Sequence, residues 1–270
     1  MTRKTYLLLL ILMSILLLVA CSTNDDTPKK DKDSDATTST DQTDEDQNDD
    51  DSSDDAKQEK NDDNSSTSSD KTNKEKTNKI TKQIKMDEAN VKQPTDFPTN
   101  KKVKSVIKKN NENTYTIDYE TESKEKIATF TGTAYKSANA ANRDLSKFMD
   151  GKDVPANEQT EEDLGHGVKG YGAGATGHAY FSWGEGNWLL NISSLTKDKM
   201  DNPAIARKMV DYLESHTLPA PKHTGIVYVD YPDGGDAVSV DIRWQEDEML
   251  YQLKTDKVPL DALQMATSIK

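Results

Sequence analysis

The chain has one cysteine among its 270 residues, and a long part of it has almost no apolar side chains. One cysteine excludes an intramolecular disulfide, so a folded part outside the cell would have to be held together by its core. Only 33% of the residues are hydrophobic, less than is usual for a globular chain. The deficit is concentrated in residues 22–79. Such a segment cannot bury enough surface to offset its ordering entropy, and we expect it to be disordered.

Charge is distributed in blocks. Residues 22–70 hold 18 acidic residues and 5 lysines, and residues 71–110 hold 12 lysines and 4 acidic residues. We interpret the acidic block as a solvated spacer that an anionic surface repels, with a metal-binding or phosphate-mimicking tract as the alternative. The Lys-rich block is suited to an anionic wall polymer or to lipid headgroups, and equally to the chain's own acidic part. It has no interleaved aromatic residues, so we expect no nucleic-acid partner.

The N-terminus has the features of an export signal. Arg3 and Lys4 supply positive charge, and the 14 residues that follow from Leu7 to Ala20 are apolar except for Ser14. This run fits a signal peptide and is shorter than the 18 or more residues expected of a membrane-spanning helix. We therefore expect residues 1–20 to be a cleaved signal peptide.

The end of this run, Leu18-Val19-Ala20-Cys21, resembles the lipobox of bacterial lipoprotein precursors, and the spacer composition favours a Gram-positive host. The resemblance implies cleavage between Ala20 and Cys21 and a diacylglyceryl thioether, with palmitate-type acyl chains, on the Cys21 thiol. Two acyl chains give stable anchoring where one is marginal. The expected location is the extracytoplasmic face of the cell membrane, with the membrane itself as the first partner.

Residues 21–95 are expected to form a charged linker, acidic over 22–70 and Lys-rich from 71, and residues 96–270 an α+β domain. Alternation and turn residues predict strands, and 3.6-residue periodicity with capping residues predicts helices. The strands are expected at 115–119, 127–135, 180–183, 188–192, 226–231, 238–244 and 249–253, with a turn at 232–235. The helices are expected to begin after Ser137, at Pro203 with Asp201 or Asn202 as cap, and at Pro259.

Two of these units match each other. When Trp183 is aligned with Trp244, Trp188 meets Met249 and the next apolar residues correspond without a gap. The helices that follow align at their prolines. We interpret this as a duplicated β-hairpin-plus-helix unit, divided near 219–223, although two unrelated units of similar period remain the alternative. The fold class expected is α+β, an antiparallel sheet with helices on one face.

The glycine-rich stretch 165–177 matches G-x-G-x-x-G twice, but it precedes a strand and not a helix, so dinucleotide binding is not expected. A mobile loop or a glycine-bulged strand is expected, with Gly172 and Gly174 as candidate ligand contacts. His166 and His178 could form a metal site with Glu161 or Asp163 if folding brought them together, but their spacing in the sequence does not indicate one. His216 and His223 are expected to be ordinary surface histidines. Ser182 beside Trp183 suggests no triad, and we expect no metal and no cofactor.

The globular part resembles the uncharacterised domains of Gram-positive lipoproteins, and this resemblance implies no activity. The first hypothesis is a non-enzymatic binding or interaction module at the cell surface, with an anionic wall polymer or another surface protein as partner. Its candidate contacts are Trp183, Trp188 and Trp244, for which core packing is the alternative. The second hypothesis is a hydrolase of cell-wall material that uses carboxylates or a histidine-bound metal. The third is a carrier with an apolar concavity.

Overall fold

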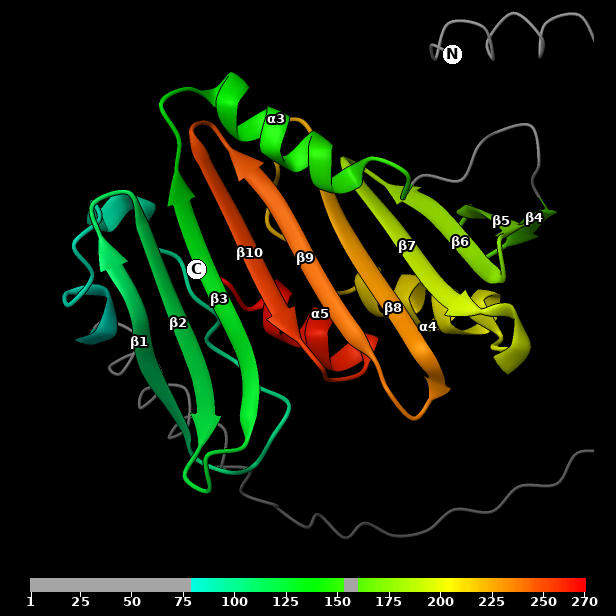
Figure 1. Ribbon diagram of the computed structural model, residues 1–270, viewed down its shortest axis with the longest axis horizontal. Coiled ribbons are helices and arrows are strands. Elements are labelled where there is room, and N and C mark those ends of the chain that lie inside the picture. The colour runs from blue at the N-terminus through cyan, green and yellow to red at the C-terminus, as the bar shows by residue number, and fades with distance from the viewer. Residues whose placement is uncertain (1–78, 153–159) are drawn as a thin grey trace, which may run out of the picture. The chain divides into compact units, whose positions relative to one another are not determined.

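The computed structural model describes residues 79–152 and 160–270, which form one ten-stranded sheet with helices packed against it (Figure 1). The strand order is β1-β2-β3-β10-β9-β8-β7-β6-β5-β4, and every neighbouring pair is antiparallel except β7 and β8. The strands are β1 Val103–Asn111, β2 Thr114–Thr121, β3 Lys126–Ala134, β4 Thr160–Asp163, β5 Lys169–Ala175, β6 His178–Glu185, β7 Trp188–Leu195, β8 Gly225–Gly235, β9 Ser239–Glu246 and β10 Met249–Thr255.

The seven strands expected from alternation are all present, and so is the α+β class. The residues expected as a turn at 232–235 fall within β8, which runs to Gly235, but the backbone does turn there, since Gly234 has φ +54° and the N–H of Asp236 donates to the carbonyl of Asp233 at 3.2 Å. Pro232 is exposed, and the pairing of β8 with its neighbours ends at Asp230 and Tyr231. Beyond that point the missing N–H of proline costs no ladder hydrogen bond.

The duplicated unit is visible in the strand register. Trp183 pairs with Leu190 across the β6–β7 hairpin, and Trp244 pairs with Tyr251 across β9–β10. These are the pairs that the sequence alignment places at equivalent positions. Helix α4 (Asn202–Leu213) follows the first hairpin and α5 (Pro259–Thr267) follows the second. The parallel pairing of β7 with β8 joins the two copies into one sheet.

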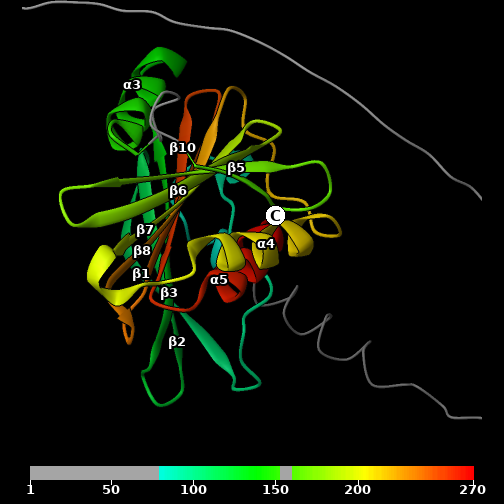
Figure 2. The same ribbon diagram turned by 90° about the vertical axis from the view of Figure 1, so that its right-hand side faces the viewer.

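Helices α4 and α5 pack side by side on one face of the sheet (Figure 2). Asp201 caps α4, because its carboxylate accepts the backbone N–H of Ala204 at 2.9 Å, as expected. Helix α3 (Ala138–Met149), capped by Ser137, crosses one end of the opposite face, so the helices lie on both faces and not on one as expected. There Leu145 is buried against Ile226 and Leu250, which alternate with residues that face α4 and α5.

The main core lies between the sheet and the α4–α5 layer. Alternate residues of each central strand point into it, so each of these strands has one apolar row. The largest of its fully buried side chains include Trp244, Tyr115, Tyr119, Tyr251, Phe130, Ile117, Leu190, Ile192 and Met209. Between the sheet and these helices the described residues therefore form one continuous packed core.

The packed part of the chain begins before residue 96, where the sequence placed the start of the domain. Residues 79–102, which we call the strap, run along the core side of β1–β3 and include the short helix η1 (Glu88–Asn90). Ile84, Met86 and Val91 are buried there. Ile80, Ile84 and Val91 give only a weak helical pattern in the sequence, which is why this segment was not assigned to the domain. Strand β1 was also missed, because lysines fill much of this edge strand.

Candidate functional site

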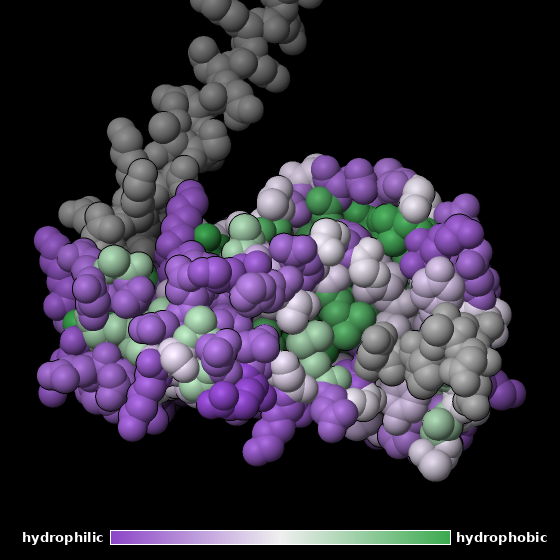
Figure 3. Space-filling model, turned by 90° about the horizontal axis from the view of Figure 1, so that it is seen from above, coloured by the Kyte–Doolittle hydropathy of each residue, from purple (hydrophilic) through white to green (hydrophobic). Residues whose placement is uncertain are grey.

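The side chains that point away from α4 and α5 form a polar surface over five strands, which we call the open sheet face. Of the described helices, α3 packs on this side and covers one end (Figure 1). Hydrophilic residues gather over the β1–β3 side of the molecule when it is seen from the α3 end (Figure 3). The polar residues of the open sheet face include Lys104, Lys108, Lys109, Thr116, Asp118, Glu120, Lys126, Thr129, Thr131, Asp241, Arg243, Gln252 and Lys254.

Strand register brings these residues into cross-strand rows. Thr116 lies opposite Thr131, and their hydroxyls are 3.1 Å apart. Asp118 lies opposite Thr129, whose hydroxyl donates to the carboxylate at 2.7 Å. Such pairs stabilise a sheet where its face is exposed to water. The open sheet face is therefore an ordered polar surface.

Two carboxylates organise the charge of this face. Asp241 accepts two hydrogen bonds from the guanidinium of Arg243, at 2.9 and 2.8 Å, and two from Gln252 at 2.9 Å. The ammonium of Lys254 lies 3.3 Å from Asp241. Asp241 therefore has a full set of partners, as a nearly buried carboxylate requires.

Asp118 has a similar environment. The ammonium groups of Lys126 and Lys108 lie 3.4 and 3.9 Å from its carboxylate. The Asp118 side chain is 12% exposed, whereas those of Lys108 and Lys126 are 53% and 57% exposed. The carboxylates are thus largely buried, and the ammonium groups project into solvent. Three acidic and six basic side chains occupy this surface, so it presents positive charge although residues 111–270 are acidic overall, with 26 acidic and 16 basic residues.

Aromatic groups border this surface below α3. The guanidinium carbon of Arg243 lies 3.4 Å from the ring centroid of Phe148, and the Lys152 ammonium lies 4.4 Å from the same ring. The Phe148 ring meets Tyr228 edge-on. Burial raises the pKa of the Tyr228 hydroxyl, against a hydrogen bond with Ser193 that lowers it. Tyr228 is therefore a neutral donor at physiological pH.

Asn191 lies next to Tyr228 in the same row and has an incomplete hydrogen-bond set. Its side-chain amide donates to the carbonyl of Lys152 at 2.5 Å, and its buried Oδ1 atom has no hydrogen-bond partner among the described residues. An unpaired buried acceptor carries a cost of about 1–3 kcal/mol. The border of the open sheet face thus contains a buried polar amide in addition to its aromatic rings.

The three tryptophans are core residues. Trp183 is 2% exposed, Trp188 7% and Trp244 0%, so none of them presents a ring to solvent. Their indole N–H groups are all paired inside the protein. This is the alternative that the sequence left open for these residues, and it removes the basis for an exposed tryptophan surface.

The glycine-rich stretch forms β5, close to one edge of the sheet, and is not a phosphate loop. Gly170, Gly172 and Gly174 alternate along the side that faces Phe181. A Cβ on Gly170 would lie 2.5 Å from the Phe181 ring, so glycine is needed there for close packing. Gly172 and Gly174 are more open, and nothing in their surroundings identifies a ligand contact.

The structure separates the two histidines that a metal or hydrolase site would have combined. His166 lies 3.0 Å from Asp211 and 3.7 Å from Glu214 of α4. His178 stacks on Tyr180, on the side of β6 that faces away from α4. Within the described ranges, no group of three His, Cys, Asp or Glu side chains is arranged to hold a metal ion.

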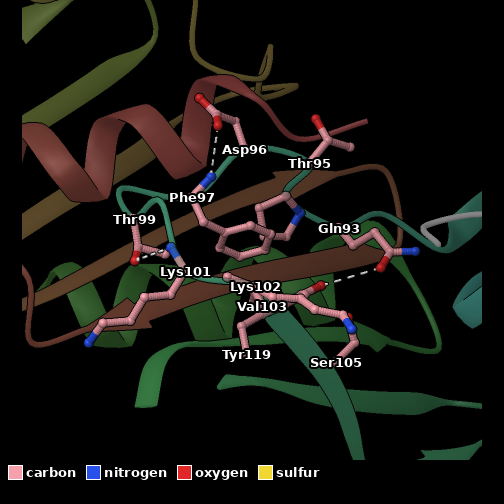
Figure 4. Close-up of a pocket in the computed structure, with 11 residues that line it drawn as sticks. Gln93, Thr95, Asp96, Phe97, Thr99, Lys101, Lys102, Val103, Ser105 and Tyr119 are labelled. Carbon is pink, nitrogen blue, oxygen red and sulfur yellow. Dashed lines mark hydrogen bonds between the residues drawn. The ribbon is translucent and has the colours of Figure 1, made fainter. Parts of the chain in front are cut away.

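A small polar cavity of about 130 Å³ lies between the strap and β1 (Figure 4). Its floor is the ring pair of Phe97 and Tyr119, with centroids 4.8 Å apart. Lys101 and Lys102 reach away from it to Glu125 and Glu122, at 3.2 and 3.3 Å. The cavity has room for a few water molecules and directs no free charge inward, so we do not regard it as the functional site.

Comparison of the chain with family models, with curated proteins and with solved structures finds no match. Across residues 79–152 and 160–270, none of the helices has the length and apolar character that crossing a membrane requires. Ala20 and Cys21 lie outside the described residues.

The sequence did not identify the lysines of the open sheet face as a group. A local signal was present in Val240-Asp241-Ile242-Arg243-Trp244, where charged and apolar residues alternate along one strand. That alternation shows that Asp241 and Arg243 share a face. It does not show that Lys108, Lys126 and Lys254, from three other strands, lie on the same face.

Proposed function

We propose that this protein is a lipid-anchored, extracytoplasmic binding module whose open sheet face holds an anionic polymer, without catalysing a reaction. The observation that carries the proposal is the layered charge of that face, with exposed ammonium groups above nearly buried carboxylates. The carboxylates fix the positions of the cations, and the surplus of cations remains available to a ligand. A surface of this kind attracts polyanions through charge.

The shape of the site favours a polymer over a small ligand. The cations extend from β1 to β9 across five neighbouring strands, a distance of roughly 20 Å at the usual strand spacing. The surface is a sheet face and not an enclosed pocket, so a small anion would be held on one side only. A linear polymer of phosphate groups could contact several ammonium groups and release several counterions. The partly exposed Tyr228 at the border would suit hydroxyl groups of such a polymer.

The N-terminal sequence supports the same location. Cys21 is the expected lipid attachment site, and residues 22–78 would connect that anchor to the strap. A flexible chain of about 57 residues has an end-to-end distance of roughly 40–45 Å, and self-repulsion of its acidic part would lengthen it. The domain would then reach polymer that lies beyond the lipid headgroups.

The two alternatives have less support. A hydrolase would need a cleft with converging catalytic groups, and His166 and His178 lie on opposite sides of the sheet. A carrier of an apolar ligand would need a large apolar concavity, and the apolar-walled groove beside Glu185 measures about 360 Å³. We therefore retain the binding module as the proposed function.

Binding of polyglycerol phosphate to the mature chain, anchored in uncharged phosphatidylcholine vesicles, tests the proposal. A variant with Lys108, Lys126 and Lys254 changed to Gln should bind about 100-fold more weakly, taking about 1 kcal/mol per lysine. The slope of log affinity against log salt should fall by about 3. The matched control changes Lys197, Lys199 and Lys208 to Gln, outside the open sheet face, with the same change in net charge.

Equal losses in the two triple variants would show that net charge alone matters and would overturn the site. Absence of binding by the unmodified chain at low salt would overturn the function. Dextran, a neutral polymer, should not bind. Mass spectrometry of the mature N-terminus tests the anchor separately, since an intact Met1 or an unmodified Cys21 would contradict it.

A further inference from the structure

The duplicated unit carries a tryptophan–glutamate pair in each copy. In β6 the indole N–H of Trp183 donates to Glu185 at 3.1 Å, and in β9 the indole N–H of Trp244 donates to Glu246 at 2.8 Å. Both pairs lie at the end of the first strand of their hairpin, just before the turn. The repeat has therefore preserved the same carboxylate in the same local geometry.

In the second copy an ammonium group occupies this carboxylate. Lys92, from the strap, places its Nζ atom 2.7 Å from Oε2 and 2.8 Å from Oε1 of Glu246. The same Nζ atom lies 5.6 Å from the ring centroid of Tyr251. Glu246 thus receives an indole N–H from its own strand and a lysine ammonium from a distant segment, with an aromatic ring beside it.

In the first copy the described residues supply no such cation. No Lys, Arg or His side chain among them lies within 4 Å of the Glu185 carboxylate. A groove of about 360 Å³ opens beside it instead. Its apolar walls come from the turn after β6, the end of α4 and the loop that follows α4, and include Trp188, Leu213, Leu218, Pro219 and Pro221. Viewed from this end, the molecule shows apolar residues at its surface between polar ones (Figure 3).

The electrostatics of the groove favour a positive ligand. Burial raises the pKa of Glu185, and the nearby charge of Glu214 raises it further. The hydrogen bond from Trp183 and the neighbouring His166 oppose this rise. A half-buried carboxylate in an apolar groove is costly to leave without a counter-charge, and a cation with an apolar body would satisfy both parts of the site.

We infer that this groove binds a primary ammonium group at the end of a short alkyl chain, as Lys92 binds Glu246 in the other copy. The ammonium would meet Glu185, and the alkyl chain would lie against Leu213, Leu218 and Pro219. This site lies on the α4 side of the sheet and is separate from the open sheet face. It does not depend on the proposed function.

Titration of the full chain with n-butylammonium, followed by the indole N–H resonance of Trp183 in NMR spectra, tests the inference. We expect a saturable shift of the Trp183 resonance, with little change at Trp244, whose partner already holds Lys92. Neutral n-pentanol, of similar length, should bind at least tenfold more weakly. Titration with a lysine-containing peptide and with the free amine distinguishes a polypeptide ligand from a small one.

Glu185→Gln should weaken amine binding at least tenfold while the spectrum keeps its native dispersion. The matched control is Glu214→Gln, which removes a nearby carboxylate that does not line the groove, and this change should leave affinity within about threefold. Leu213→Ala should weaken n-butylammonium more than methylammonium, because it removes part of the apolar wall. No shift of Trp183 at millimolar amine would overturn the inference, and so would equal binding of amine and alcohol.

Discussion

The phenol oxygen of Tyr115 makes two hydrogen bonds with the backbone of Lys92, donating to its carbonyl and accepting from its N–H, both at 2.8 Å. Tyr115 lies in the core row of β2 and is fully buried. Burial raises the pKa of this hydroxyl well above its usual range, so it stays protonated and can donate. One side chain thereby satisfies both backbone groups of a strap residue that belongs to no strand.

Replacing Tyr115 with Phe should destabilise the domain by about 1–3 kcal/mol, because two buried backbone groups would lose their partner. Urea unfolding of the full chain, followed by fluorescence, measures this change. Tyr212→Phe is the control, since its hydroxyl has only a 3.4 Å contact with Thr267. A Tyr115→Phe variant as stable as the control would show that the strap is not held by this hydroxyl.

Trp244 should be among the most costly residues to truncate. It is fully buried, and the rings of Tyr251, Phe130 and Trp188 lie 5.2, 6.0 and 6.2 Å from it. Trp244→Ala should lower the free energy of unfolding by about 3–5 kcal/mol. Leu260→Ala, at a position 37% exposed, should change it by less than about 1 kcal/mol. Similar values for the two variants would contradict the packing described.

Gly225 should not tolerate a side chain. A Cβ at this position in β8 would lie 2.6 Å from Cζ3 of Trp188, in the middle of the sheet. Gly225→Ala should destabilise by about 1–3 kcal/mol through overpacking, measured by thermal or urea unfolding. Gly174→Ala is the comparison, because its nearest neighbour would be a backbone oxygen 3.8 Å away. The prediction fails if alanine is tolerated equally well at both glycines.

Asp241 should matter more to stability than the lysine above it. Asp241→Asn removes the charge that Arg243, Gln252 and Lys254 share, and should cost about 1–3 kcal/mol. Lys254→Gln removes an exposed partner and should cost less than about 1 kcal/mol. Urea unfolding at low salt measures both changes in stability. The reverse order would show that the carboxylate does not organise this surface.

Glu185 gives a dependence on pH that can be measured directly. Its pKa is raised above the ordinary value of 4.5, chiefly by burial, so the folded state binds this proton more tightly than the unfolded state. Its contribution to stability is therefore most favourable below pH 4.5 and decreases as the pH rises through the raised pKa. Over that window wild type should lose stability relative to Glu185→Gln. A constant difference between them from pH 4 to 7 would contradict the raised pKa.

Much of the fold could be predicted because the signals were local. Alternation in β2, β9 and β10 and the capping residues Ser137 and Asp201 depend on near neighbours, and the structure confirms them. The match between the two units was detectable because Trp183 and Trp244 lie at the same distance from the turn of their hairpins. Strand β1 was missed because lysines interrupt its apolar pattern. The strap was missed because its apolar residues are irregularly spaced.

The candidate sites were less accessible to prediction. The three tryptophans considered as a binding surface are buried. A single sequence cannot distinguish an aromatic residue that faces a partner from one that packs in the core. The lysines of the open sheet face belong to strands that are distant in sequence. The role inferred for the groove depends on comparing Glu185 with Glu246, whose carboxylate binds the Lys92 ammonium only in the folded chain.

The sequence by itself determined which segments alternate, where the helices begin and which two units repeat, because each depends on the spacing of neighbouring residues. It also carries the Cys21 motif, which lies outside the described residues. The tertiary structure decided which polar side chains share a surface and which carboxylate of the repeat receives a cation. Those outcomes depend on strand order and on the path of the strap, which bring together residues more than a hundred positions apart.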